Sequence, residues 1–473
     1  MAGERVAILG AGPAGLSAGW KLAEGGAHVL VLEKGLSVGG QSTTFSWKGM
    51  RLDYGPHKVY TQDPRIQREV ESLFEQGELL SIPKRSRIRL AGAFFDFPVR
   101  IQELLFKLNP LVAANCGSSY ALALAASKLR KPREDSYESY MLARFGRGTY
   151  DLIFGPYARK VWGEPRELSA SLAKSRVAVP SLLDLARRLV AGDRGKPAIS
   201  AKEFSYPRKG IVELSEKMAA RIRRNGGEIL LCSTPEKLVL DGKRITRLEY
   251  GSGGQPASFE PTHVVSTIPI AHALSLIKPA TPEVNAAADS ASTLRHRNLI
   301  LAVIVVKKDR AFPDNWLFFP EAKFIFNRVY EQKGFSEEMV QKGQTAVCAE
   351  ITCAPADPIW TAGDEEVCGR VIADLVSAEV LKKEDVTDSG VFRMELAYPM
   401  YDIGYEARLA RALGFLDSLE NLYAIGRNGS FNYAGMLDCM DMGIRTAEHM
   451  LGSAPAPLWA ESRKRFQNYV TVD

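Results

Sequence analysis

No two cysteines of this 473-residue chain are spaced as a CxxC pair, and its six cysteines and six histidines form no cluster with metal-ligand spacing. This composition predicts free thiols in a reducing compartment, and neither a disulfide scaffold nor a metal site. The chain also lacks an uninterrupted apolar run of about 18 to 20 residues, so no membrane-spanning helix is predicted. Glycines and a proline interrupt its apolar N-terminus, which therefore does not resemble a signal peptide. We expect a cytoplasmic protein.

A strong charge of one sign is missing as well. Lys and Arg together exceed Asp and Glu by only six, which is too few over this length to predict nucleic-acid binding. This small excess of positive charge remains compatible with the binding of an anionic small molecule or with peripheral contact with a membrane. Apolar residues make up 46% of the chain and charged residues 25%. These values are typical of globular proteins, and the length predicts more than one domain. The oligomeric state is left open.

The first forty residues predict a strand, a glycine turn, a helix and a second strand. The apolar run Arg5–Leu9 is typical of a buried parallel strand, and Val29–Leu32 predicts the next strand, which ends at Glu33. Between them lies a GxGxxG pattern that opens a helix. The candidate cofactor-binding residues of this turn are Gly10, Gly12, Pro13, Ala14 and Gly15. A GxGxxG pattern in this context is a strong signal for dinucleotide binding.

Each glycine of the turn has a physical role in binding a dinucleotide. Gly10 permits the tight turn, Gly12 leaves room for a pyrophosphate, and Gly15 lets the helix pack close to the strand. The amide groups at the helix N-terminus bind phosphate. Glu33 is placed to accept hydrogen bonds from ribose hydroxyls. This pattern leaves NAD and FAD open.

A second glycine pair carries a resemblance that favours FAD. Glu33-Lys34 is followed by Gly39-Gly40-Gln41-Ser42, and then by Tyr54-Gly55-Pro56-His57. This arrangement resembles the flavoprotein group of amine oxidases, protoporphyrinogen oxidases, carotenoid desaturases and UDP-galactopyranose mutases. The resemblance implies noncovalent FAD, with the glycine pair beside its pyrophosphate and ribityl chain. Many members have Arg after the pair where this chain has Gln41, which weakens the match to the oxidase branch.

The resemblance covers nearly the whole chain and implies an α/β fold. A Rossmann-type FAD-binding domain is expected at residues 1–65, 205–275 and 415–455. A discontinuous α+β substrate domain is expected at 66–204, where it is mainly helical, and at 276–414, where it is rich in strands. Residues 456–473 form a C-terminal tail. The sequence pattern further predicts helices at 65–74, 101–108 and 211–224, a hairpin at 86–97, basic loops at 128–133 and 187–196, a strand at 299–306 and a short helix at 461–469.

Two later segments are implied to complete the cofactor site. In the group's second segment, main chain corresponding to Leu238 lies against the adenine. The third segment supplies Gly426, Arg427, Tyr433 and Met436, ahead of a helix that we expect from about Asp441.

Three segments resemble the mutase-like members more closely. Residues 54–61 are similar to the mutase loop that places a histidine, here His57, beside the flavin ring. Residues 156–163 lead to Arg176, and residues 315–320 lead to Arg328. In mutases the corresponding arginines lie near the substrate diphosphate. The resemblance therefore implies His57, Arg176 and Arg328 as catalytic candidates.

The chemistry of arginine supports such a role. A guanidinium makes bidentate, charge-assisted hydrogen bonds to phosphate and stays charged when it is partly buried. Arg176, Arg328 and Arg427 on the flavin face would suit a diphosphate, a propionate-bearing substrate or another acid. The alternative is that Arg176 and Arg328 form ordinary ion pairs. His57 is a flavin contact, a group that steers a proton, or a structural histidine.

The aromatic candidates for substrate binding depart in part from the mutase pattern. Phe318 stands where mutases have a tyrosine that meets the diphosphate, and Met436-Leu437 is an apolar pair. Both differences favour a substrate less phosphate-like than a nucleotide sugar. The remaining substrate-binding candidates are Trp162, Tyr398 and Tyr433.

Three functions fit these observations. The first is an FAD-dependent oxidoreductase that takes a hydride from an anionic or polar small molecule onto flavin N5. The second is a redox-neutral mutase acting on a nucleotide sugar through reduced flavin, with Arg176 and Arg328 holding the diphosphate. NAD(P)H is left open as an external reductant. The third, a flavin-binding or lipid-carrying module without catalysis, is the least favoured because the glycine turn is intact and a substrate domain is present.

Overall fold

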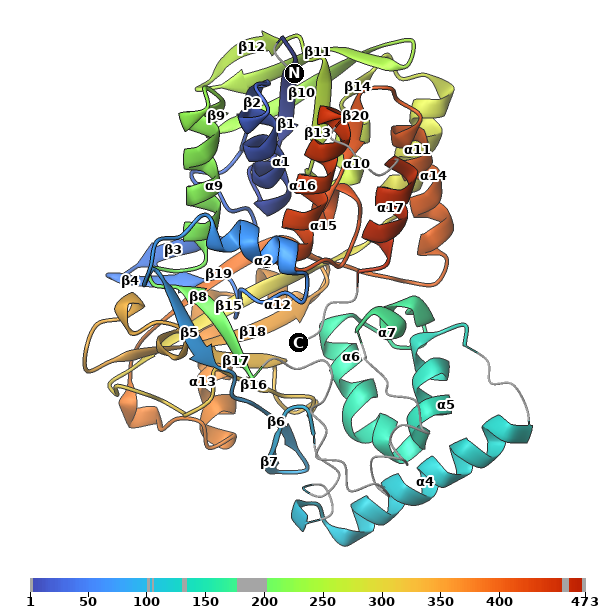
Figure 1. Cartoon of the computed structure of the whole chain (residues 1–473). Helices are drawn as coiled ribbons and strands as arrows, with labels where there is room; N and C mark the ends of the chain where they lie inside the picture. The colour runs from blue at the N-terminus through green and yellow to red at the C-terminus, as the bar shows by residue number, and fades with distance from the viewer. Residues whose placement is uncertain are drawn as a thin grey trace.

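The computed structural model describes residues 3–99, 103, 106–129, 134–176, 202–452 and 459–469. Three regions are visible in Figure 1: a parallel sheet with its helices at the top, a strand-rich region at the lower left and a helical region at the lower right. The predicted helix at 101–108 falls partly outside the described residues. The predicted basic loop at 187–196 falls wholly outside them, as does most of that at 128–133.

A five-stranded parallel sheet forms the core of the cofactor region, with strand order β20-β13-β1-β2-β9. Its strands are β1 (Arg5–Leu9), β2 (His28–Leu32), β9 (Glu228–Leu230), β13 (His263–Ser266) and β20 (Leu422–Ala424). The strands are apolar because both faces of the sheet are buried, one by helices and the other by side chains of a second sheet and further helices. The predicted Rossmann-type α/β fold is thereby confirmed. Three segments far apart in the sequence build one sheet.

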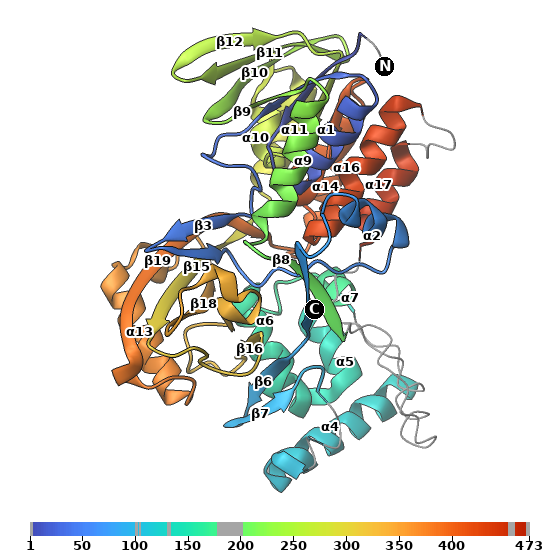
Figure 2. The same cartoon turned by 60° about the vertical axis from the view of Figure 1, so that its left-hand side comes forward.

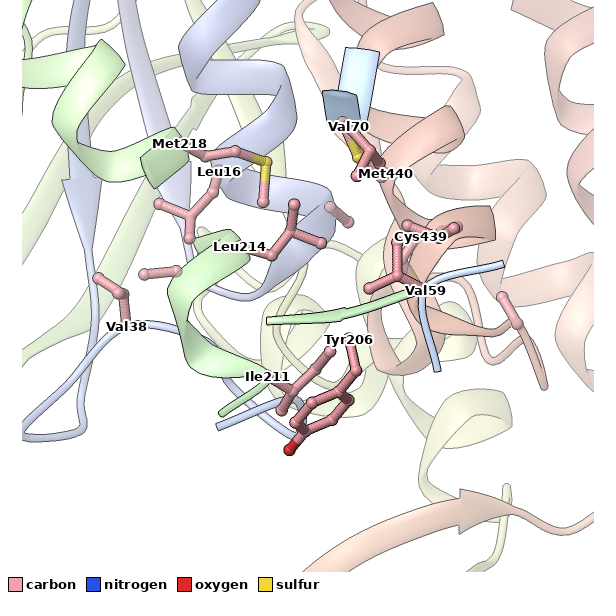
Figure 3. Close-up of a cluster of buried hydrophobic side chains, with 14 of the residues drawn as sticks. Leu16, Val38, Val59, Val70, Tyr206, Ile211, Leu214, Met218, Cys439 and Met440 are labelled. Carbon is pink, nitrogen blue, oxygen red and sulfur yellow. The ribbon is translucent and has the colours of Figure 1, made fainter. Parts of the chain in front are cut away.

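Close packing of helices on this sheet depends on small residues. The covering helices include α1 (Pro13–Glu24), α9 (Val212–Arg224) and α16 (Met436–Leu451). A Cβ on Gly443 of α16 would lie 2.1 Å from the Ser17 Oγ and 2.2 Å from the Ala14 carbonyl oxygen of α1. Figure 3 shows Leu16 of α1 beside Leu214 and Met218 of α9 in the buried cluster. The glycine turn before α1 is thus held on a rigid support.

The predicted start of α16 is wrong. The helix begins at Met436 rather than near Asp441. Asp438 explains the earlier start, since its carboxylate accepts a hydrogen bond from the Gly435 amide at 2.8 Å and caps the first turn.

A second, four-stranded sheet lies beside the cofactor sheet. It consists of β10 (Ser233–Asp241), β11 (Arg244–Ser252), β12 (Gln255–Phe259) and β14 (Ile277–Lys278). The helices that follow in this region are α10 (Ile270–Ser275), α11 (Pro282–Ser292), α14 (Tyr405–Asp417), α15 (Gly426–Gly429) and α17 (Trp459–Gln467).

A seven-stranded sheet, ordered β19-β15-β18-β17-β16-β6-β7, forms the strand-rich region. Its strands are β6 (Ser86–Leu90), β7 (Ala93–Asp96), β15 (His296–Val306), β16 (Trp316–Phe318), β17 (Arg328–Glu331), β18 (Thr345–Cys353) and β19 (Val386–Pro399). The predicted hairpin at 86–97 is confirmed as β6 and β7. Short helices η2 (Gln332–Gly334), η3 (Glu337–Met339), α12 (Pro358–Thr361) and η4 (Lys383–Asp385) join these strands, and α13 (Asp364–Ser377) covers one face.

Smaller elements connect the cofactor sheet to this region. They are β3 (Thr44–Trp47), β4 (Met50–Asp53), α2 (Pro64–Glu71), β5 (Leu79–Pro83) and β8 (Glu203–Pro207). β5 pairs with β8. The buried Asp53 carboxylate accepts hydrogen bonds from Tyr206 of β8 and from the Thr44 hydroxyl at 2.6 Å. Burial raises the pKa of Asp53 to about 6.

The helical region contains α4 (Pro110–Leu129), α5 (Tyr137–Thr149), η1 (Tyr150–Phe154), α6 (Gly155–Val161) and α7 (Ala170–Arg176). Lys160 of α6 connects the helical region to the strand-rich region. Its Nζ donates to the main-chain carbonyls of Phe319, Glu321 and Phe326, at 2.8, 2.6 and 3.0 Å. No helix among the described residues is long and apolar enough to cross a membrane.

Candidate active site

One cavity of about 2040 Å³ runs from the glycine turn to the helical region. It begins at the carboxyl ends of β1 and β2, where ligands of such sheets bind. It passes the start of α16 and ends against α4, α5 and η1. A cofactor and a substrate therefore have one continuous space.

The three glycines of the first turn have different surroundings. A Cβ on Gly12 would meet only the Gly40 Cα, at 4.0 Å, so this side of the turn is open. Gly10 has a φ of +102°, and its Cβ would lie 2.4 Å from the Thr267 Oγ1. A Cβ on Gly15 would lie 2.1 Å from the Gly10 carbonyl oxygen. Gly10 and Gly15 thus shape the turn, while Gly12 faces free space.

The second glycine pair lies opposite the first turn. The Gly39 amide donates to the Ala11 carbonyl at 2.8 Å. A Cβ on Gly40 would lie 3.2 Å from the Gly12 Cα. Gln41 reaches away to the strand-rich region, where its Nε2 donates to the Leu396 carbonyl at 2.7 Å. The facing glycines form a cradle of exposed main chain that suits a pyrophosphate.

Glu33 is oriented by main-chain amides. Its Oε2 accepts from the Ala11 amide and its Oε1 accepts from the Gly35 amide, both at 2.8 Å. Each carboxylate oxygen has a second lone pair. Because Glu33 lines the cavity, these lone pairs are placed to accept hydroxyl hydrogens from a ligand.

Arg328 is held by a buried carboxylate. Its Nε and Nη2 donate to the two oxygens of Glu350, at 2.6 and 3.0 Å, and Glu350 is fully buried. The two residues are directly opposed on β17 and β18. The bidentate pair fixes the guanidinium at the cavity wall and neutralises its charge.

Arg176 and Arg427 bind main-chain carbonyls beside Tyr433. The Arg176 guanidinium lies 3.5 Å from the Tyr433 ring centroid, and its Nη2 donates to the Tyr433 carbonyl at 2.9 Å. Arg427 donates to the Ala434 and Ala397 carbonyls. The three arginines come from separate segments and line the same cavity.

Tyr433 is the centre of an aromatic cluster. It stacks with Tyr398 at a centroid distance of 5.3 Å, and its hydroxyl accepts a hydrogen bond from Trp162 Nε1 at 3.0 Å. Burial raises the pKa of Tyr398, so this side chain is neutral. Phe318 lies farther along the same wall, edge-on to Tyr157.

His57 is a neutral ring at physiological pH. Burial, followed by the nearby Arg427 and Arg328, lowers its pKa to about 4. Its Nε2 is enclosed and has no hydrogen-bond partner among the described residues. An enclosed nitrogen in a cavity wall is a site at which a ligand could exchange a hydrogen bond.

Most of the predicted site residues lie in the cavity wall. Those brought together there are Gly10, Gly12, Pro13, Ala14, Glu33, Lys34, Gly40, Gln41, Ser42, Gly55, Pro56, His57, Trp162, Arg176, Phe318, Arg328, Tyr398, Gly426, Arg427, Tyr433 and Met436. Gly15 and Gly39 lie behind the wall and support the turns.

Leu238 is placed elsewhere. It is fully buried within β10, and its amide bonds to the Leu276 carbonyl. The first residues of β10, Ser233, Thr234 and Pro235, line the cavity in its place, because the strand runs away from the site. Sequence reasoning also missed Thr267 and Pro269, which lie just after β13 of the cofactor sheet and line the cavity.

A family model described as NAD(P)-binding Rossmann-like domain matches residues 8–76. A protein named probable UDP-galactopyranose mutase from Klebsiella pneumoniae is 28% identical over 37% of this chain and 45% of its own. The chloroplastic protoporphyrinogen oxidase of Nicotiana tabacum is 22% identical over 67% of this chain and 59% of its own. The matched parts thus span less than two thirds of these relatives.

The fold agrees with a solved structure over its whole length. A crystal structure of reduced UDP-galactopyranose mutase aligns with a TM-score of 0.84 and 19% identity, covering 100% of this chain and 99% of the other. The predicted resemblance to the group containing these enzymes is confirmed.

Proposed function

We propose that this chain is an FAD-dependent oxidoreductase that takes a hydride from an anionic small molecule. The observation that carries the proposal is the shared cavity, since it joins the glycine cradle to three arginines from separate segments. The residues fit FAD. The space beside Gly12 is open, Glu33 faces it with oriented oxygens, and the enclosed His57 Nε2 lacks a partner among the described residues.

The residues of this chain have distinct tasks in such a reaction. Main chain at Gly12 and Gly40 would hold the pyrophosphate, and Glu33 would bind the ribose. When bound, FAD supplies the hydride acceptor. Arg176 and Arg427 would orient the substrate anion, while neutral His57 exchanges one hydrogen bond without adding charge. The aromatic wall of Trp162, Tyr398 and Tyr433 would exclude water.

The charge of the wall bears on the substrate class. Glu350 neutralises the charge of Arg328, and Arg427 donates to main-chain carbonyls. Because one of the three guanidiniums is already paired with a carboxylate, the wall suits a carboxylate or a single phosphate better than a nucleotide diphosphate, and this supports an acidic substrate.

A second candidate is a redox-neutral mutase acting on a nucleotide sugar. It is favoured by the full-length agreement with reduced UDP-galactopyranose mutase and by the partial match in sequence. Such a reaction needs reduced flavin, for which NAD(P)H would be an external source.

An anaerobic experiment separates the two candidates. Purified flavoprotein is mixed with protoporphyrinogen or simpler acidic donors, and loss of oxidised-flavin absorbance is followed. Separately, the flavin is reduced and UDP-galactopyranose is added. We expect flavin reduction in the first arm. Isomerisation without net oxidation in the second arm, with no reduction in the first, would establish the mutase instead.

Substitution of the arginines tests the proposed anion site. We expect Arg176→Lys to lower kcat/KM at least about tenfold, because lysine keeps the charge and loses the planar fork that meets an anion. Arg328→Lys should lower it as much, because lysine loses the bidentate pair with Glu350 that fixes this side chain at the cavity wall. The flavin spectrum should stay unaltered. Steady-state kinetics with the substrate found above provide the measurement.

A matched control is available for Arg328. Arg310 also bonds a fully buried carboxylate, with its Nε 2.8 Å from Glu331, and it does not line the cavity. Arg310→Lys should therefore retain wild-type kinetics. Unchanged kinetics in both cavity variants would remove these arginines from the substrate site.

A further inference from the structure

Helix α4 exposes an unusual amount of apolar surface. None of its twenty residues is buried. Seven large hydrophobic side chains are exposed in the described chain, and four belong to α4 and the turn before it. They are Phe106, Leu111, Leu122 and Leu129, which are 89%, 81%, 71% and 89% exposed. Contiguous exposed apolar surface of this kind marks an interaction site.

The outer face of α4 carries no charge before its last turn. No Asp, Glu, Lys or Arg occurs between Pro110 and Ser127. Leu111, Ala114, Ser118, Leu122 and Leu129 are exposed, and their spacing puts them on one side of the helix. A helix facing only water would carry charged residues there.

Packing with α5 fixes which face of α4 is outward. A Cβ on Gly146 would lie 2.4 Å from main-chain atoms of Ser119, and one on Gly148 would lie 2.8 Å from the Asn115 carbonyl oxygen. The Gly148 amide donates to the Ser119 hydroxyl at 2.9 Å. The two helices therefore touch at their backbones, and the exposed face is a fixed feature of the fold.

The inner side of α4 belongs to the cavity wall. Its residues there are Ala113, Cys116, Gly117, Tyr120 and Leu124. Figures 1 and 2 both show α4 at the end of the molecule farthest from the cofactor sheet. One helix thus separates the cavity from the apolar outer surface.

The positive charge in and next to the sequence of α4 indicates which kind of partner its apolar face binds. The sequence between Glu103 and Glu134 has no acidic residue, and it contains Lys107, Lys128, Arg130, Lys131 and Arg133. Exposed Lys128 lies in the last turn of α4. An uncharged apolar face that ends in a turn with an exposed lysine is complementary to anionic lipid.

We propose that α4 lies on the surface of a membrane that contains anionic phospholipid. Phe106, Leu111, Leu122 and Leu129 enter the boundary between headgroups and acyl chains, and Lys128 contacts lipid phosphate. The helix binds parallel to the bilayer. This inference goes beyond the proposed function and does not depend on the substrate.

Flotation of the purified full-length flavoprotein with lipid vesicles tests the proposal. Vesicles of phosphatidylcholine alone are compared with vesicles that also contain phosphatidylglycerol. We expect at least about tenfold tighter binding to the anionic vesicles, and weaker binding as salt is added. Absence of binding to both vesicles would overturn the proposal.

Matched variants locate the contact. The double variant Leu111→Gln/Leu122→Gln should bind vesicles at least about tenfold more weakly, with unchanged flavin content and thermal unfolding. Ile403→Gln is the control, because Ile403 is also exposed but lies outside α4. Equal losses in both variants would overturn the assignment to α4.

Two further measurements cover the remaining outcomes. In Leu122→Trp, the tryptophan emission should shift to the blue with anionic vesicles, which reports insertion even if the double variant misfolds. No shift would contradict insertion. Sedimentation without lipid tests whether a second copy of the chain covers α4. If the protein forms dimers that the double variant abolishes, and if it binds no vesicles, α4 contacts a second chain and the membrane proposal is overturned.

Discussion

Gly12 and Gly15 stand in the same turn, yet an added side chain would meet different surroundings at each. The Gly12 φ of −79° suits any residue, and its Cβ would point toward Gly40 across open space. The Cβ of Gly15 would collide with the Gly10 carbonyl. Cofactor binding and folding can therefore be separated at neighbouring positions.

We expect Gly12→Val to fold and to purify mostly without FAD, since its branched side chain occupies the phosphate space. Gly15→Ala should instead lower the thermal stability of the fold itself. Flavin-to-protein absorbance and thermal unfolding by circular dichroism give the two readouts. A Gly12→Val protein with full flavin content would show that the pyrophosphate lies elsewhere.

His57 determines one pH dependence. Its pKa is lowered to about 4 from 6.5, so the unfolded chain binds more protons between these values. The contribution of His57 to stability is therefore complete above pH 6.5 and is lost as the pH falls toward 4.

We expect His57→Gln to reduce the loss of stability between pH 6.5 and 4, as measured by chemical denaturation at several pH values. In the wild-type enzyme, no step in kcat near pH 6.5 should arise from His57. An acid limb near pH 6.5 that disappears in His57→Gln would show that the ring titrates normally.

At the scale of elements, Lys160 connects α6 to the strand-rich region by donating hydrogen bonds to three main-chain carbonyls. Lys160→Met would leave these acceptors without their donor, and we expect a loss of at least about 2 kcal/mol in unfolding free energy. Lys174→Met, at an exposed ion pair, should cost under about 1 kcal/mol. Equal stability of the two variants would contradict the role of Lys160.

The same lysine adds a second pH dependence. Burial lowers its pKa to about 7 from 10.5. The unfolded chain then binds more protons between these values, so the stability contributed by this group rises with pH across that window. Lys160→Met should remove this rise.

The sequence predicts local elements better than the contacts between them. The glycine turn, Glu33 and the hairpin of β6 and β7 are encoded within short windows. The Arg328–Glu350 pair is not, because it depends on how β17 and β18 align. Leu238 was misplaced for a related reason, since the direction of β10 decides which of its residues reach the cavity.

At the scale of the whole molecule, the cofactor site joins three distant segments of the chain. FAD bound to the folded state alone would stabilise all three together, by about 2.7 kcal/mol at a concentration one hundred times its Kd. We expect the melting temperature of apoprotein to rise with added FAD and to stay constant with NAD(P)H. A rise with NAD(P)H and none with FAD would identify the other dinucleotide.

The order of strands in the cofactor sheet also affects the synthesis of the protein. β1 leaves the ribosome well before its partner β13, which begins only at His263, and before the next strand, β20, which begins at Leu422. At about 5 to 20 residues per second, several hundred residues take on the order of tens of seconds. Until β13 has been made, the apolar strand β1 of the nascent chain has no partner on that side. Chaperone binding to nascent chains is therefore expected to concentrate on β1 until β13 has been made.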